Sequence, residues 1–232
     1  MSDFFRGLKS GIPIGLGYLS VSFSFGILAV TYGLEWWQAV LISMTTLTSA
    51  GQLAGISLMM NPGQYIEMLV SQLTINVRYS FMSVSLSQKT SPQFKGFRRF
   101  VFGFFMTDEV FAVASNEKEV TTRFFAGLTV FPYVGWTLGT FMGALMGNVL
   151  PEIILSGLCL AIYGMFIAIV VPKTRDSSKL FLVVIIAVAL SSIFFYLPFL
   201  KDISAGITIS VCAVAAASLG ALLFPVKEDD RL

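Results

Sequence analysis

The stretch that decides the fold class is residues 10–34, SGIPIGLGYLSVSFSFGILAVTYGL, which contains no charged side chain. A helix needs about 20 apolar residues to span the hydrocarbon core of a bilayer, and this stretch is long enough. Further uncharged stretches cover residues 36–66, 124–151, 153–172, 180–200 and 203–226, and apolar segments with embedded charges cover residues 65–87 and 97–115. The sequence therefore predicts an all-α integral membrane protein with about eight membrane segments, of which one or two are broken or re-entrant.

The composition supports this fold class and excludes several functions. Of the 232 residues, 56% are hydrophobic and 12% are charged, whereas a soluble domain carries about 25% charged residues. The chain has no His, and its two Cys, Cys159 and Cys212, lie far apart in apolar stretches. A Cys/His zinc site is therefore excluded, no cofactor is predicted, and a disulfide framework is not expected. The formal net charge of +2 indicates no basic surface for nucleic acid.

The whole chain, residues 1–232, is predicted to form one membrane transport domain with short connections. A weak resemblance between residues 1–118 and 119–232 indicates an internal repeat, because each half has a Pro near the start of a Gly-rich stretch. Gly and Pro are also frequent in ordinary membrane helices, which is the alternative explanation. Pro13 removes a backbone donor and Gly17 adds conformational freedom, so these two residues are candidates for a helix break.

The sequence leaves two membrane topologies open. If all eight segments cross with the N-terminus inside, nine Lys and Arg lie inside and five outside. If one segment within residues 36–87 and the segment at 97–115 enter and return, thirteen lie inside, Lys201 lies outside and Arg78 lies within the membrane. Cytoplasmic loops carry an excess of Lys and Arg, which favours the second topology with a cytoplasmic N-terminus. Eight plain crossings with an exception to the charge rule are the alternative.

Both segments that would return contain polar residues at membrane depth, at residues 48–52 (TSAGQ) and 107–109 (TDE). A membrane helix is interrupted only where protein or water satisfies its backbone, and transporters place such breaks at the substrate site. Amide N–H groups at a half-helix N-terminus suit a carboxylate. Ser49, Gly51 and Gln52 are therefore candidate substrate-binding residues. A small-residue face for helix packing is the alternative.

Arg78 is the most informative charged residue of the chain. It lies about three helical turns, or about 16 Å, from Lys89, which is farther than a guanidinium can reach toward the membrane face. An unpaired charge at that depth costs about 2.5–3.5 kcal/mol by insertion scales. We therefore expect Arg78 to face the protein interior, to have an anionic partner and to bind the substrate carboxylate. Nearby Asn76 is a further candidate for substrate binding, or a hydrogen-bonding group between helices.

Asp108 and Glu109 are the expected partners of Arg78. Asp108 lies about 15 Å from Arg98 along a helix, so its depth matches that of Arg78. Adjacent helical residues point about 100° apart, so one acid pairs with Arg78 and the other remains to carry a coupling proton. The sequence leaves open which acid has which role. A static ion pair that holds two helices together is the alternative.

These elements resemble, in their order along the chain, the AzlC-type branched-chain amino acid permease family. The resemblance covers about residues 5–225 and is carried by residues 13–18 (PIGLGY), 49–52 (SAGQ), 75–79 (INVRY) and 105–112 (FMTDEVFA). The sequence departs from the family at Tyr79, because many members have His after the Arg. If that His relays protons in relatives, Asp108 or Glu109 must do so here, unless this chain is coupled differently.

The resemblance implies export of hydrophobic amino acids (Leu, Ile, Val and Met) across the bacterial inner (plasma) membrane. It also implies a small AzlD-type membrane subunit as partner, and an ion gradient as the driving force. The chain lacks a phosphate-binding Gly-x-x-x-x-Gly-Lys-Ser/Thr loop, so it is not expected to hydrolyse ATP. Without His or a suitable acid pair, an enzyme is not expected either. A channel or a structural subunit of a membrane assembly is the alternative function.

Overall fold

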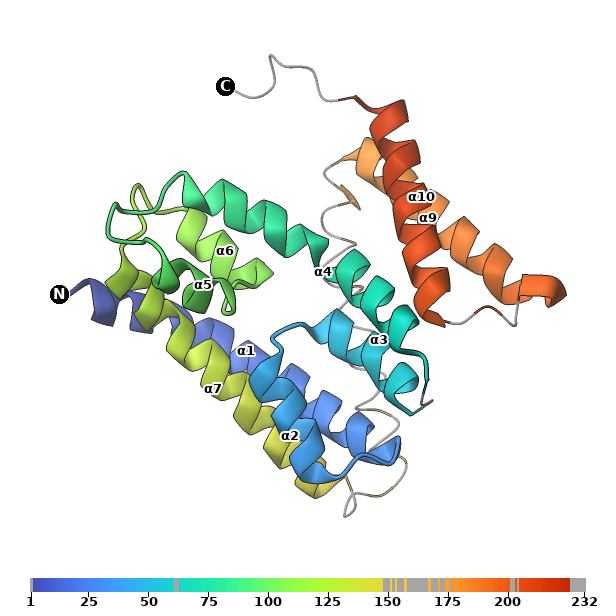
Figure 1. Ribbon diagram of the computed structural model, residues 1–232, viewed down its shortest axis with the longest axis horizontal. Coiled ribbons are helices and arrows are strands. Elements are labelled where there is room, and N and C mark those ends of the chain that lie inside the picture. The colour runs from blue at the N-terminus through green and yellow to red at the C-terminus, as the bar shows by residue number, and fades with distance from the viewer. Residues whose placement is uncertain are drawn as a thin grey trace. The chain divides into compact units, whose positions relative to one another are not determined.

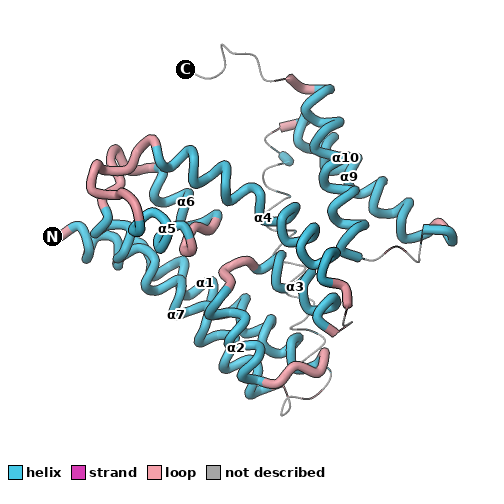
Figure 2. Tube along the Cα trace, in the orientation of Figure 1, coloured by secondary structure: helices cyan, strands magenta, loops and turns pink. Residues whose placement is uncertain are grey.

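The structure is a computed structural model that describes residues 2–60, 63–147, 177–200 and 205–225, with residue 203 and scattered positions between 151 and 175. The regular elements of these residues are helices, shown in Figures 1 and 2. They are α1 (Asp3–Thr31), α2 (Trp36–Thr45), α3 (Ser49–Met59), α4 (Tyr65–Ser87), α5 (Phe97–Gly103), α6 (Asp108–Ser115), α7 (Thr122–Met146), α9 (Ser178–Tyr196), the 3-10 helix η1 (Pro198–Leu200) and α10 (Ala205–Leu223).

Three of the described helices, α1, α7 and α9, are long and apolar enough to cross a membrane. Helix α4 is also long, but it carries Glu67 and Arg78. The all-helical prediction is confirmed, whereas the count of about eight membrane segments is not. Two predicted segments are each divided into two short helices, and most of the segment at 153–172 lies outside the described residues.

The chain divides into two compact units, one of residues 1–56 and 76–162 and the other of residues 57–75 and 163–232. The second unit contains α9 and α10, which pack against each other. A Cβ on Gly220 of α10 would lie 2.8 Å from Val183 Cγ2 of α9, so the two helices approach closely there. All predicted site residues belong to the first unit. The prediction of one domain with two weak halves stays a prediction.

The first unit is built on a close parallel pair formed by α1 and α7, which lie side by side in Figure 1. Gly7 faces Phe124 near the start of both helices, and Gly26 faces Thr140 near their ends. A Cβ at either glycine would overlap a carbonyl oxygen of α7. Small residues allow membrane helices to pack at such short distances, where dispersion and weak polar contacts stabilise the pair. The two helices therefore begin at the same end of the unit.

Helix α1 is continuous from Asp3 to Thr31, with Pro13 inside it. The predicted helix break at Pro13 and Gly17 is therefore wrong. A Pro removes only one backbone donor, while Gly11 and Gly15 on either side of it pack directly on the α7 backbone. This packing is consistent with a helix that continues through the Pro. Gly17 faces open space, with nothing within 4 Å of a Cβ.

Helices α2 and α3 form a hairpin that enters from the C-terminal end of the α1–α7 pair. Helix α2 runs antiparallel to α7, since the Trp36 ring contacts Phe141 at 5.9 Å and the Met44 carbonyl accepts from Tyr133 at 3.2 Å. The chain then breaks at residues 46–48, about halfway along α7. Helix α3 returns, because Ile56 packs in the same core cluster as the first turn of α2 and the end of α1.

Helices α5 and α6 form a second hairpin that enters from the opposite end. The two ends of this segment lie together, because Lys89 Nζ donates to the Ser115 carbonyl at 2.7 Å and Ser91 N donates to the Val120 carbonyl at 3.0 Å. Its break, at residues 104–107, lies against the middle of α1 and α7. The first unit thus has helix interruptions beside both predicted polar sites.

Candidate functional site

The two helix breaks meet halfway along the α1–α7 pair, and Tyr133 of α7 contacts both. Its hydroxyl donates to the Met44 carbonyl beside the first break, and its ring packs on Phe105 at 5.5 Å and on Phe104 at 6.3 Å at the second. These contacts place residues from three chain segments around one central region. None of these segments is near another in sequence, so only folding brings them together.

At the first break, Gln52 is the central polar residue. Its Nε2 donates to the Thr46 carbonyl and hydroxyl, both at 3.0 Å, and to Ser43 Oγ at 3.3 Å. Ser43 Oγ in turn lies 2.7 Å from Thr140 Oγ1 of α7. Gln52 therefore ties the two half-helices to each other and to α7, across the interrupted backbone.

The carbonyl end of the Gln52 amide differs from the Nε2 end in its hydrogen bonding. Gln52 is only 3% exposed, and its Oε1 atom is buried without a hydrogen-bond partner. A buried acceptor without a partner costs about 1–3 kcal/mol, so this oxygen is suited to accept an N–H from a ligand. The other two residues predicted here lie close to it: Ser49 begins α3, and the Gly51 amide donates to Thr48 Oγ1 at 3.2 Å.

At the second break, Thr107 caps α6 and two acids follow it. Thr107 Oγ1 accepts from the Val110 amide at 3.4 Å, which satisfies one of the free amides at the helix start. The Asp108 carboxylate pairs with Arg78 of α4, with 2.8 Å between Nη1 and Oδ2. The guanidinium also lies over the Tyr79 ring, 4.9 Å from its centroid. The structure therefore selects Asp108 as the partner of Arg78.

The burial of this ion pair differs from the prediction. The side chain of Arg78 is 45% exposed and that of Asp108 is 47% exposed. The expectation that Arg78 faces the protein interior is therefore wrong for the described residues. The physical reason is that the long side chain reaches Asp108 along the surface of the first unit, so pairing rather than burial satisfies its charge. Asn76 lies on the same helix two residues earlier, and residues spaced by two do not share a helix face.

Glu109 has a partner that the sequence did not indicate. The Tyr18 hydroxyl of α1 hydrogen-bonds to the Glu109 carboxylate and lies 2.7 Å from Thr107 Oγ1. The Tyr18 ring packs on Trp136 of α7 at 5.3 Å, which fixes its position. The one available signal was a phenol halfway along an uncharged stretch, where a buried Tyr hydroxyl usually needs a partner.

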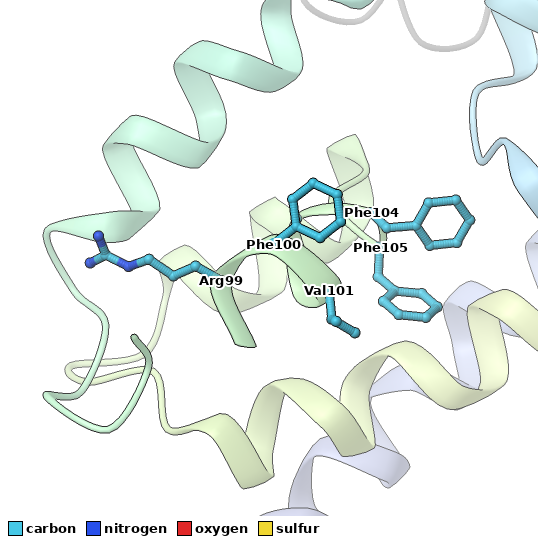
Figure 3. A pocket seen from close by; sticks show the side chains of 6 residues that line it. Arg99, Phe100, Val101, Phe104 and Phe105 are labelled. Atoms are coloured by element: carbon cyan, nitrogen blue, oxygen red, sulfur yellow. The ribbon is translucent and has the colours of Figure 1, made fainter. Parts of the chain in front are cut away.

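An apolar pocket adjoins the second break. It has a volume of about 700 Å³ and is lined by Arg99, Phe100, Val101, Gly103, Phe104 and Phe105. Figure 3 shows the rings of Phe100, Phe104 and Phe105 on the far side of the short helix from the Arg99 guanidinium. Aromatic side chains thus line a pocket that adjoins the second break, which is a suitable environment for an apolar group.

Comparison with known proteins identifies the family. The sequence model of the AzlC protein family matches residues 13–150, more than half of the chain. The chain belongs to the AzlC family. The matched residues include both helix breaks, Arg78 and the two acids of α6.

The relatives of this AzlC-family protein are membrane proteins. A membrane protein of Archaeoglobus fulgidus is 34% identical over 178 residues, which cover 74% of this chain and 76% of the relative. Inner membrane protein YgaZ of Escherichia coli K12 is 26% identical over 155 residues, or 63% of this chain and 62% of YgaZ. A membrane protein of Helicobacter pylori J99 is 25% identical over 158 residues, or 64% and 68% of the two chains. No solved structure matches the chain. The protein is therefore a membrane protein of a family generally linked to amino-acid transport.

Proposed function

We propose that this AzlC-family protein is a secondary transporter that exports hydrophobic amino acids (Leu, Ile, Val and Met) across the bacterial inner membrane. It uses an ion gradient, is not an enzyme, and works with a small AzlD-type membrane subunit. The observation that carries the proposal is the meeting of two helix breaks, an ion pair and an unpaired buried acceptor halfway along the α1–α7 pair. Interrupted helices at mid-depth are typical of transporter substrate sites.

The groups around the two breaks complement a zwitterionic amino acid with an apolar side chain. The Gln52 Oε1 acceptor suits the substrate ammonium, and Arg78 suits the substrate carboxylate, since guanidinium binds carboxylate in a two-pronged geometry. The aromatic rings of Phe104 and Phe105 suit the apolar side chain. The half-exposed ion pair supports this assignment, because a ligand can reach Arg78 without displacing buried side chains.

The hairpin geometry supports the topology in which two segments re-enter. The first hairpin enters from the C-terminal end of α1 and α7, and the second from their N-terminal end. Basic residues then gather at the N-terminal end: Arg6, Lys9, Lys89, Lys95, Arg98, Arg99, Lys118 and Arg123. By the positive-inside rule this end, with the N-terminus, is cytoplasmic.

An exposed apolar surface of α7 supports the proposal of a partner subunit. Val130, Val134, Leu138 and Met142 recur every four residues and are each about 40–50% exposed, so they form one apolar stripe. The glycine face of the same helix is occupied by α1. The stripe is the surface on which we expect the AzlD-type subunit to pack.

The experiment is export from proteoliposomes that contain the full chain with its partner subunit. Vesicles loaded with radiolabelled leucine, valine or methionine should lose label when a pH gradient is applied. Arg78→Ala should abolish this flux, whereas Arg98→Ala, the same change at an exposed residue of the basic end, should leave it intact. A channel would still conduct in the Arg78→Ala variant. Absence of flux for all three amino acids in the wild type would overturn the proposal.

A further inference from the structure

We infer that Glu109, rather than Asp108, binds and releases a proton during transport, and that Tyr18 is the positioning residue that holds it in both protonation states. The inference rests on the proposed function, because it assigns one step of a transport cycle. It is carried by the different partners of two adjacent acids at the start of α6: a guanidinium for Asp108 and a phenol for Glu109.

Asp108 is held as an anion. Its carboxylate lies 2.8 Å from the Arg78 guanidinium, and the positive end of the α6 dipole also favours a negative charge at this position. Because Arg stays protonated in proteins, a proton on Asp108 would leave a cation without its anion. Asp108 therefore keeps its charge while the pair persists.

The partner of Glu109 is the Tyr18 hydroxyl, and a hydroxyl can either donate or accept a hydrogen bond. When Glu109 is ionised, the Tyr18 hydroxyl donates its one hydrogen to the carboxylate. When Glu109 is protonated, Glu109 donates to the Tyr18 oxygen, and Tyr18 donates to Thr107 Oγ1, which lies 2.7 Å away. Neither state requires a heavy atom to move or a charge to lose its partner. Glu109 can therefore change protonation at little structural cost.

The step moves one proton and no electrons. The Glu109 carboxylate takes a proton from water on one side of the membrane and becomes a neutral carboxylic acid. It later returns that proton to water on the other side and becomes a carboxylate again. Tyr18 and Thr107 keep their own protons throughout, because only the direction of their hydrogen bonds changes.

The charged and titratable groups that the structure places around Glu109 come from three described helices. They are Tyr18 of α1, Arg78 and Tyr79 of α4, and Asp108 of α6. The one cation among them, Arg78, is engaged by Asp108. Within the described residues, this arrangement leaves the phenol–hydroxyl chain as the immediate environment of Glu109.

The test separates two kinds of flux in proteoliposomes that contain the full chain and its partner: leucine efflux driven by a pH gradient, and leucine–leucine exchange at equal pH. Glu109→Gln keeps an acceptor for Tyr18 but cannot bind a proton. It should lose driven efflux to the background of empty vesicles and retain exchange, whereas Asp108→Asn should lose both. If Glu109→Gln retains driven efflux, or loses exchange as completely as Asp108→Asn, the inference is overturned.

Tyr18→Phe removes the hydroxyl and keeps the ring that packs on Trp136. It should shift the pH dependence of driven efflux while exchange persists, because only proton binding at Glu109 has lost its support. Tyr32→Phe, at the C-terminal cap of the same helix, is the matched control and should show the wild-type profile. An unchanged pH profile in Tyr18→Phe would contradict the positioning role.

A spectroscopic measurement decides the same point without transport. Infrared difference spectra of the reconstituted protein between acidic and neutral buffer report carboxyl protonation. Subtracting the Glu109→Gln spectrum from the wild-type spectrum should leave a carboxyl C=O band, and subtracting the Asp108→Asn spectrum should leave none. The reverse pattern would show that Asp108 titrates. A wild type without either flux would overturn the proposed function, while the infrared result would still establish or refute proton binding by Glu109.

Discussion

Because Arg78 and Asp108 are partly exposed, their ion pair should contribute little to stability, so a role in ligand binding can be measured separately. Exposed ion pairs contribute about 0–1 kcal/mol, and both side chains here are close to half exposed. The pair is therefore a weak fastening between α4 and α6. In the proposed function, its role is to hold a guanidinium beside the second break.

Asp108→Asn should therefore lower the free energy of unfolding by less than about 1 kcal/mol and still abolish pH-driven leucine efflux. Thermal unfolding in detergent and vesicle flux measure the two effects. The control is Glu117→Gln, which breaks the 2.8 Å ion pair of Arg6 and Glu117 at the helix starts and should leave efflux intact. A large loss of stability with normal efflux would identify the Arg78 pair as structural.

Gln52 is expected to contribute more to stability than the Arg78–Asp108 pair. It is buried, and the Nε2 end of its amide hydrogen-bonds to neighbouring parts of the protein. Gln52→Ala removes its bonds to Thr46 and Ser43, so it should lower the free energy of unfolding by about 1–3 kcal/mol. Denaturation of the purified chain measures this change. The exposed Gln93 provides the control, since Gln93→Ala should change stability by less than about 0.5 kcal/mol. Equal effects of the two variants would contradict the burial of Gln52.

At the scale of elements, the helix pair of α1 and α7 is the rigid part against which both hairpins pack. Its close approach depends on glycines that face backbone atoms rather than side chains. The hairpins, by contrast, consist of short helices that pack on the pair through shared apolar clusters and through polar contacts such as that of Tyr133 with the Met44 carbonyl. Because backbone approaches backbone most closely between α1 and α7, we expect this pair to be the part that moves least during transport.

Two glycines of α1 test this packing directly. A Cβ on Gly15 would lie 2.6 Å from the Phe131 carbonyl oxygen, whereas nothing lies within 4 Å of a Cβ on Gly17. Gly15→Ala should therefore destabilise the protein by about 1–3 kcal/mol through overpacking. Gly17→Ala should stabilise it by about 0.5–1 kcal/mol, because Ala is the better helix former. Melting temperatures of the two variants check this, and similar values would be incompatible with the parallel pair.

At the scale of the whole molecule, we expect the hairpins to determine which loops share a membrane side. Lys89 reaches Ser115 and the chain around Ser91 pairs with Val120, so we expect the two ends of the segment at 97–115 to lie on one side. A helix that crossed fully would separate them by the thickness of the bilayer, about 30 Å.

Cysteine labelling tests this topology in a Cys159→Ser, Cys212→Ser background. Single cysteines introduced by Lys95→Cys and Lys118→Cys should both react with an impermeant maleimide in inverted vesicles and be protected in right-side-out vesicles. The positive-inside rule also places Lys9→Cys on that side. Labelling of the positions at 95 and 118 from opposite sides would show that the segment crosses and would refute the hairpin.

The sequence by itself determined the membrane class, the helical fold and the positions of both interruptions. These are local properties: hydropathy depends on which residues follow one another, and a run such as TSAGQ at 48–52 or TDE at 107–109 is polar whatever surrounds it. The importance of Arg78 followed for the same reason, because a charge in an apolar stretch always needs a partner. The predicted break at Pro13 was wrong because a proline weakens a helix locally, while packing against another helix decides whether the helix is interrupted.

Only the tertiary structure decided which groups meet. Asp108 and Glu109 are neighbours in sequence with similar chemistry, and their partners differ because one helix face points at Arg78 and the next at Tyr18. Tyr18 and Glu109 are 91 residues apart in the chain, so no local pattern links them. The return of each hairpin likewise depends on contacts with α1 and α7. Pairing in space depends on how helix faces approach one another, and that information is absent from the order of residues along one segment.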